Sequence, residues 1–187
     1  PYGCAKVYAY NICRNYRNSY NMYISNGILF NHESSRRGTN FVTNKVVKEA
    51  VKIKLGLSNS LTLGNLDASR DWGHAKDYVK AMWMILNQKT ADDFVIATNK
   101  QHTIKQFVNI VANKLGIKIK WRGKNLNEKG FLGKRPIIQI KKRYFRPLEV
   151  SNLKGNYKKA RNKLKWSPKI NITKLIDEMI NYEIKNA

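Results

Sequence analysis

Short apolar segments alternate with amphipathic stretches along almost the whole of this 187-residue sequence. The segment 22–30 is rich in β-branched and aromatic residues and predicts a buried strand, whereas apolar residues in 41–55 recur with the period of a helix. Further strands are expected at 61–63, 94–97 and 117–121, and further helices at 4–18, 74–86, 103–115, 157–164 and 173–184. This alternation predicts an α/β fold with a largely parallel sheet.

Residues with particular backbone preferences mark the expected ends of these helices. Gly56 and Gly116 each follow a periodic stretch, and glycine commonly ends a helix. Thr103 is a candidate N-cap, and Ser167-Pro168 separates the last two helices because proline has no backbone N–H. The polar segments 31–40 and 123–133 are expected to be loops.

The net charge is +24, from 36 Lys and Arg against 12 Asp and Glu. Such an excess is typical of proteins that bind nucleic acids. Here, however, the basic residues are spread along the chain, and abundant Lys, Asn and Ile are also what an A/T-rich genome produces. Clustered basic residues with interleaved aromatics are not apparent. A nucleic-acid-binding domain is therefore an alternative function rather than the first interpretation.

The composition excludes several other classes of protein. Hydrophobic residues make up 42% of the chain, which is enough for a packed core and excludes wholesale disorder. No apolar run approaches the ~18 residues of a membrane span. Cys4 and Cys13 are too few for a disulfide framework, and the three histidines lack a metal-ligand spacing. We therefore expect no metal site, and a reduced, cytoplasmic location.

Tyr2 and Lys6 are the first pair of residues in the sequence that could act together in catalysis. Four residues apart on a helix, they lie on one face. A phenol is a poor base near neutrality because its pKa is about 10, and a neighbouring ammonium group lowers that pKa. The pair is thus a sensible general base for an alcohol proton, although the same spacing occurs by chance in many helices.

Several sequence blocks favour a functional role for this pair over a chance spacing, because they occur in the same order as in one known family. Residues 1–6 (PYGCAK) resemble the PYGxSK segment of the extended short-chain dehydrogenases that act on nucleotide sugars, with small Cys4 and Ala5 as departures. The other blocks are similar to signatures of the GDP-mannose 4,6-dehydratases: GILFNHES at 27–34, LGNLD at 63–67, RDWGHAKDYV at 70–79, DFVIAT at 93–98 and RYFRP at 143–147.

This resemblance implies a fold and a reaction. The fold would be the C-terminal part of a Rossmann-like doubly wound parallel sheet with a smaller α/β substrate-binding lobe. The family oxidises C4 of GDP-mannose with bound NADP, eliminates water across C5–C6 and returns the hydride to C6. Another nucleotide-sugar epimerase or dehydratase of the same superfamily is the alternative reaction. A homo-oligomer, dimer or tetramer, is expected by family analogy.

The resemblance also implies roles for individual residues. Tyr2 would take the O4 proton, and Lys6 would lower its pKa and hold the nicotinamide ribose. His32 and Arg37 would contact the cofactor, with Arg36 competing for the role of Arg37. The expected substrate contacts are Asn31 at the diphosphate, Val42 and Lys45 near guanine, Arg70 and Arg146 at pyrophosphate and ribose, and Glu149 at ribose hydroxyls.

One family feature is missing from this sequence. The glycine-rich turn that seats the cofactor pyrophosphate on a helix N-terminus does not occur. We therefore expect residues 1–40 to be the end of the cofactor domain and 41–187 to be mainly the substrate-binding lobe, with some segments returning to the cofactor domain. The chain alone is expected to have little or no activity, and an inactive truncated relic stays open as an alternative.

Overall fold

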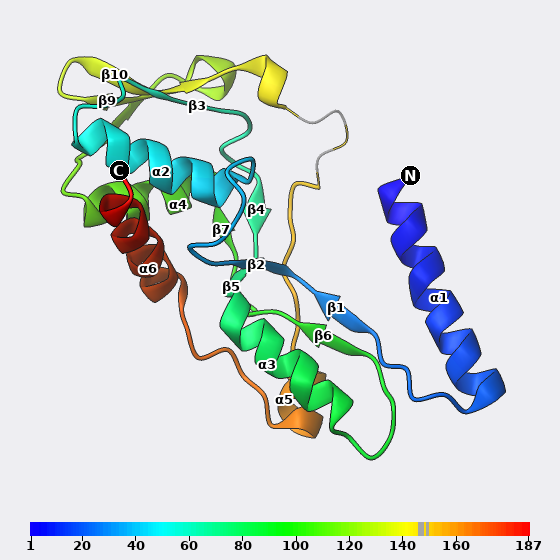
Figure 1. Cartoon of the computed structure of the whole chain (residues 1–187). Coiled ribbons are helices and arrows are strands. Elements are labelled where there is room, and N and C mark those ends of the chain that lie inside the picture. The colour runs from blue at the N-terminus through cyan, green and yellow to red at the C-terminus, as the bar shows by residue number, and fades with distance from the viewer. Residues whose placement is uncertain (146–147, 149) are drawn as a thin grey trace.

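Helices and strands alternate along the chain in the computed structural model, which describes residues 1–145, 148 and 150–187 (Figure 1). The helices are α1 (Tyr2–Tyr20), α2 (Val42–Lys54), α3 (Ala75–Leu86), α4 (Ile104–Lys114), α5 (Lys158–Leu164) and α6 (Ile172–Lys185). The strands are β1 (Gly27–Leu29), β2 (Asn31–Glu33), β3 (Leu61–Leu63), β4 (Ser69–Arg70), β5 (Trp72–His74), β6 (Phe94–Ile96), β7 (His102–Thr103), β8 (Lys120–Arg122), β9 (Lys129–Leu132) and β10 (Arg135–Ile140). Over these described ranges, no helix is long and apolar enough to cross a membrane.

Parallel pairing joins strands that are far apart in the sequence. β1 pairs with β6, β2 with β5, and β3 with β10, all in parallel. β8, β9 and β10 form an antiparallel meander, and β4 pairs antiparallel with β7. The predicted α/β class with parallel strands is confirmed, and the meander adds an antiparallel part that the sequence did not predict.

The larger hydrophobic core lies where α2, α4 and α6 pack against one another and against β3 and β10. Val47 of α2, Val111 of α4 and Ile176 of α6 are completely buried in it. The N-cap Thr103 forms a capping box with Gln106, which confirms the predicted start of α4. These contacts hold the N-terminal end of α2 beside β3.

A second core lies between α3, β6 and α5. Tyr78, Ile96 and Ala160 are completely buried there, and Trp166 packs on Tyr78 edge to face. The Nε1 atom of Trp166 donates a hydrogen bond to the carbonyl oxygen of Asp77 at 3.0 Å. The predicted division at residue 40 stays a prediction.

Three local predictions were wrong. The segment 22–30 forms a strand only at Gly27–Leu29, where Ile28 is 42% exposed rather than buried. The expected loop 31–40 begins with β2, because its polar residues pair with β5. The expected loop 123–133 contains β9, which folds back on β10 through Gly133 at a φ of 61°.

Candidate functional site

A cavity of about 520 Å³ lies between the end of β2, the first turn of α2 and the segment that follows β10. Five residues that the sequence analysis assigned to cofactor or substrate line it together: Asn31, Arg37, Val42, Lys45 and Arg70. They come from β2, the following loop, α2 and β4, so the fold gathers them from separate segments. Their individual roles stay predictions. Arg146 and Glu149 lie outside the described residues.

Among the charged side chains of the described cavity lining, the positive ones outnumber the single acid: Arg37, Lys45, Arg70 and Arg143 against Glu33. Lys45 donates a hydrogen bond from Nζ to the Thr62 carbonyl at 2.7 Å, and the same Nζ lies 4.2 Å from the centre of the Tyr144 ring. Arg70 donates from Nη1 to the carbonyls of Ser69 and Val150, at 2.8 and 2.7 Å. These contacts fix cations around a concave surface, which favours an anionic ligand.

One acidic side chain, Glu33, lies in the wall of the same cavity. Its Oε2 atom accepts a hydrogen bond from Thr43 at 2.7 Å and lies 3.1 Å from Nε of Arg37. Burial raises the pKa of Glu33 above its ordinary value, while the hydrogen bond from Thr43 and the charge of Arg37 oppose that rise. Glu33 was not predicted as a site residue. Its place in the block GILFNHES, three residues after Phe30, was a signal that could have pointed to it.

His32 lies outside the cavity lining. Its ring stacks on that of Tyr78, with the ring centres 4.9 Å apart, and its Nδ1 atom lies 2.9 Å from the Phe30 carbonyl oxygen. Since that oxygen can only accept, the contact places a proton on Nδ1. The ring is thereby held in one orientation, but its contact with a cofactor stays a prediction.

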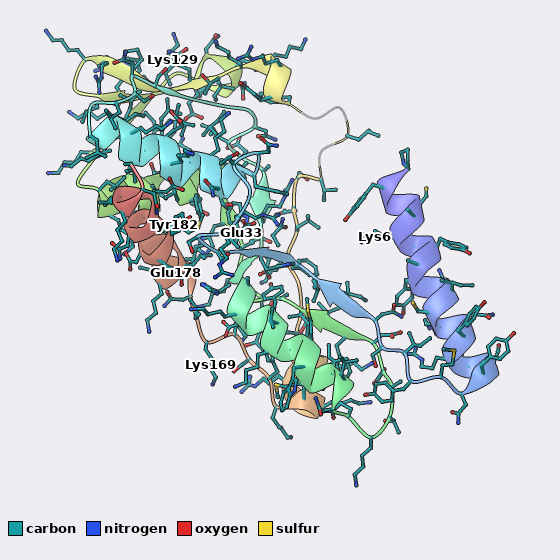
Figure 2. All side chains as sticks on the ribbon, in the orientation of Figure 1. Lys6, Glu33, Lys129, Lys169, Glu178 and Tyr182 are labelled. Atoms are coloured by element: carbon teal, nitrogen blue, oxygen red, sulfur yellow. The ribbon has the colours of Figure 1, made fainter. Side chains whose placement is uncertain are left out.

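Tyr2 and Lys6 are not brought to the cavity either. They share one face of α1, with Lys6 Nζ 5.4 Å from the centre of the Tyr2 ring, and Tyr2 is 77% exposed. Figure 2 shows Lys6 on α1, well separated from Glu33 on β2. The predicted spacing on one helix face is confirmed, and the catalytic role of the pair stays a prediction.

Asp93 joins α1 to the rest of the molecule. It accepts hydrogen bonds from Arg17 Nη1 and Nη2 at 2.8 and 3.0 Å, and from the backbone and side chain of Asn26 at 3.0 Å each. Burial alone would raise the pKa of Asp93, but the hydrogen bonds from Arg17 and Asn26 outweigh it and hold this pKa well below its ordinary value. No residue of α1 is buried, so this ion pair is a principal anchor of the helix.

We expect the variant Asp93→Asn to loosen α1. Because the folded pKa is depressed, the anchor contributes stability above the ordinary carboxyl pKa of about 3.9, and that contribution is lost as the pH falls through the folded value. Proteolysis within 21–26 should therefore be faster for the variant at pH 7. The neighbouring Asp92→Asn is the control, because Asp92 pairs with Lys159 and Lys163 rather than with α1. Equal cleavage rates for Asp93→Asn and the parent would contradict this prediction.

Comparison with known proteins places this geometry in a family. The model of the family described as GDP-mannose 4,6 dehydratase matches residues 1–179. A Vibrio cholerae GDP-mannose 4,6-dehydratase is 47% identical over 199 aligned positions, which cover 100% of this chain and 54% of the relative. The human GDP-mannose 4,6 dehydratase is also 47% identical, over 99% of this chain and 50% of its own. The chain thus spans about half the length of the curated relatives it matches.

Solved structures show the same fold at low sequence identity. RMD from Pseudomonas aeruginosa, complexed with NADPH, has a TM-score of 0.80 at 17% identity and is matched over 99% of this chain and 56% of its own. The dTDP-glucose 4,6-dehydratase of Bacillus anthracis, in complex with NAD, has a TM-score of 0.80 at 20% identity, over 100% of this chain and 52% of its own. The match over residues 1–179 and the identity with the relatives lead to one conclusion: the chain belongs to the GDP-mannose 4,6-dehydratase family.

Proposed function

We propose that this chain is the substrate-binding and proton-transferring part of a GDP-mannose 4,6-dehydratase, a lyase. The full reaction would convert GDP-mannose to GDP-4-keto-6-deoxymannose and water. The observation that supports this most is the cavity itself, where Asn31, Arg37, Val42, Lys45 and Arg70 lie together. Each of them was assigned to a nucleotide ligand from the resemblance alone.

The cavity would hold the sugar nucleotide through its charged parts. The planar guanidinium of Arg70 suits a pyrophosphate oxygen, and the Asn31 amide can donate to the same diphosphate. Lys45 and Val42, in the first turn of α2, would lie near guanine. Arg146 and Glu149 would complete the contacts with pyrophosphate and ribose.

Tyr2 would take the proton from the O4 hydroxyl of the sugar as C4 is oxidised. Lys6 lies one helical turn away, with its Nζ 5.4 Å from the centre of the Tyr2 ring, and its ammonium group would assist Tyr2 as the base. For this chemistry α1 must bring Tyr2 to the sugar, and the exposed position of α1 is compatible with such a placement.

NADP would be held by Lys6, His32 and Arg37. Arg37 fits this cofactor because, among the described residues, no hydrogen bond reaches its Nη atoms, and these donors suit a phosphate group. When bound, NADP supplies the hydride acceptor for C4 and the donor for C6. We also infer a cytoplasmic location, with which the free Cys4 and Cys13 agree, and a homo-oligomeric full-length enzyme.

Completing the chain with the upstream half of a relative tests this proposal. We expect a fusion of the upstream half of the Vibrio cholerae relative to Pro1 to convert GDP-mannose in the presence of NADP, as followed by product chromatography. The isolated chain should show little or no turnover because the glycine-rich cofactor turn is absent from it. A matched assay with dTDP-glucose is the control for substrate class. Robust turnover by the isolated chain, or preference of the fusion for dTDP-glucose, would contradict the proposal.

A further inference from the structure

Glu33 is an acidic side chain that folding removes almost completely from water. It is the last residue of β2, is 2% exposed, and lines the cavity. Figure 2 labels it where β2 ends, on the side of the strand that leads to α2. Burial of an ionised carboxylate is unfavourable unless its hydrogen bonds and ion pairs compensate, so the partners of Glu33 indicate what it is for.

The carboxylate of Glu33 joins three segments at the cavity wall. Its Oε2 atom accepts the hydrogen bond from Thr43, in the first turn of α2, at 2.7 Å. The same oxygen forms the 3.1 Å ion pair with Nε of Arg37, which lies in the loop between β2 and α2. One oxygen atom therefore connects the end of the strand, the loop and the start of the helix.

Arg37 makes two further contacts, one through its side chain and one through its backbone. Its guanidinium lies 3.4 Å from the centre of the Phe41 ring, and its carbonyl oxygen accepts a hydrogen bond from the Asn44 side chain. Nε thus lies within ion-pair distance of Glu33 without making a hydrogen bond to it, and the guanidinium carbon lies over the Phe41 ring. The two Nη atoms make no hydrogen bond within the described residues, and these are the atoms that form paired contacts with phosphate oxygens.

We propose that Glu33 is a positioning residue, which holds Arg37 against Phe41 so that the Nη atoms meet a phosphate group of a bound nucleotide. This inference rests on the proposed function, because it takes the ligand of the cavity to be a nucleotide. The phosphate belongs either to the sugar nucleotide or to the cofactor, and the two sources offer the same chemistry to a guanidinium.

The energetics argue that stability alone does not explain Glu33. Its pKa is raised by burial, against the hydrogen bond from Thr43 and the charges of Arg37 and His32. A carboxyl with a raised folded pKa stabilises the fold below its ordinary pKa, and this contribution is lost as the pH rises through the folded value. Burial therefore works against the charged form of Glu33 that pairs with Arg37. Glutamine would fill the same space and accept the Thr43 hydrogen bond without that cost.

The test compares Glu33→Gln with the parent chain in three measurements at pH 7. The thermal midpoint should stay equal or rise. The Nε–H resonance of Arg37, assigned through Arg37→Lys, should show a more mobile side chain by its heteronuclear NOE. Binding of GDP, NADP⁺ and NAD⁺ is titrated separately, and whichever nucleotide the parent binds should bind roughly tenfold more weakly to the variant. A loss confined to GDP assigns the phosphate to the sugar nucleotide, and one confined to NADP⁺ assigns it to the cofactor.

The matched control is Glu49→Gln, which removes a glutamate on α2 that pairs with Lys52 at 3.4 Å and does not line the cavity. It should change neither the Arg37 resonance nor the nucleotide affinities. Unfolding of Glu33→Gln, an equally ordered Arg37 in that variant, or unchanged affinity would overturn the positioning role. If the parent binds none of the three nucleotides, the titrations are repeated with the fusion described above. A fusion that binds none of them contradicts the proposed function, and the order of Arg37 then decides the role of Glu33.

Discussion

Replacing Asp71 by alanine is expected to lower the free energy of unfolding by about 3–5 kcal/mol. Asp71 is completely buried, and its two oxygens accept three hydrogen bonds from two distant segments. Thr98 donates from its backbone N at 2.8 Å and from its hydroxyl at 2.6 Å, and Gly155 donates from its backbone N at 3.2 Å. Alanine would leave the buried N–H of Gly155 and the part-buried N–H of Thr98 without their acceptor, whereas the Thr98 hydroxyl could still donate to the Lys100 carbonyl at 3.1 Å. Leaving such donors unpaired is more costly than the mere loss of hydrogen bonds.

Urea denaturation of the isolated chain measures this effect. Asp67→Ala is the control, because Asp67 is an exposed acid only four residues away, and its removal should change stability by less than about 0.5 kcal/mol. Asp71→Asn should fall between the two, since the amide oxygen can accept part of the hydrogen bonding. A variant Asp71→Ala as stable as Asp67→Ala would show that the connection between 71, 98 and 155 does not hold the fold.

Replacing Tyr2 by phenylalanine in the completed enzyme is expected to lower kcat by about 10²–10⁴-fold, the usual contribution of a positioned general base. Phenylalanine keeps the ring and loses only the phenolic oxygen, so substrate binding in the cavity should change little. The measurement is turnover of GDP-mannose by the fusion described above.

The control for this prediction is Tyr8→Phe. Tyr8 is on the same helix and is 70% exposed, so the same chemical change there should leave turnover intact. Circular dichroism of both variants confirms equal folding. Undiminished kcat in the Tyr2 variant would exclude Tyr2 as the base.

The helices could be predicted because their signals are local. Gly56 and Gly116 follow α2 and α4 with positive φ angles of 76° and 70°, and Thr103 accepts the predicted cap hydrogen bond from Gln106. The strand β9 could not be predicted, since Lys129–Leu132 becomes a strand only through its pairing with β8 and β10. Short strands depend on partners that are remote in sequence.

The same distinction between local and tertiary signals applies to the residues of the candidate site. Arg37, Lys45 and Arg70 were assigned roles from the family resemblance, whereas Glu33, which pairs with Arg37, and Tyr144, whose ring faces Lys45, were assigned none. Glu33 and Tyr144 gain their importance from burial and from tertiary contacts, which a motif does not contain. The position of Tyr2 relative to the cavity is likewise a matter of how α1 is held, through Asp93, and not of its sequence spacing.

The edge of strand β1 that no other described strand covers affects how strongly copies of this chain associate with one another. In the part of the chain that the structure describes, β1 pairs with β6 on one side, and no strand covers its other edge. An uncovered edge offers backbone N–H and C=O groups to any other chain and so invites association. The charge of +24 opposes this by repulsion between copies, which in about 0.1 M salt extends only ~10 Å. The excess of basic residues, which first suggested a polyanion partner, would then keep copies apart by electrostatic repulsion. This repulsion is strongest in dilute buffer and is weakened by salt.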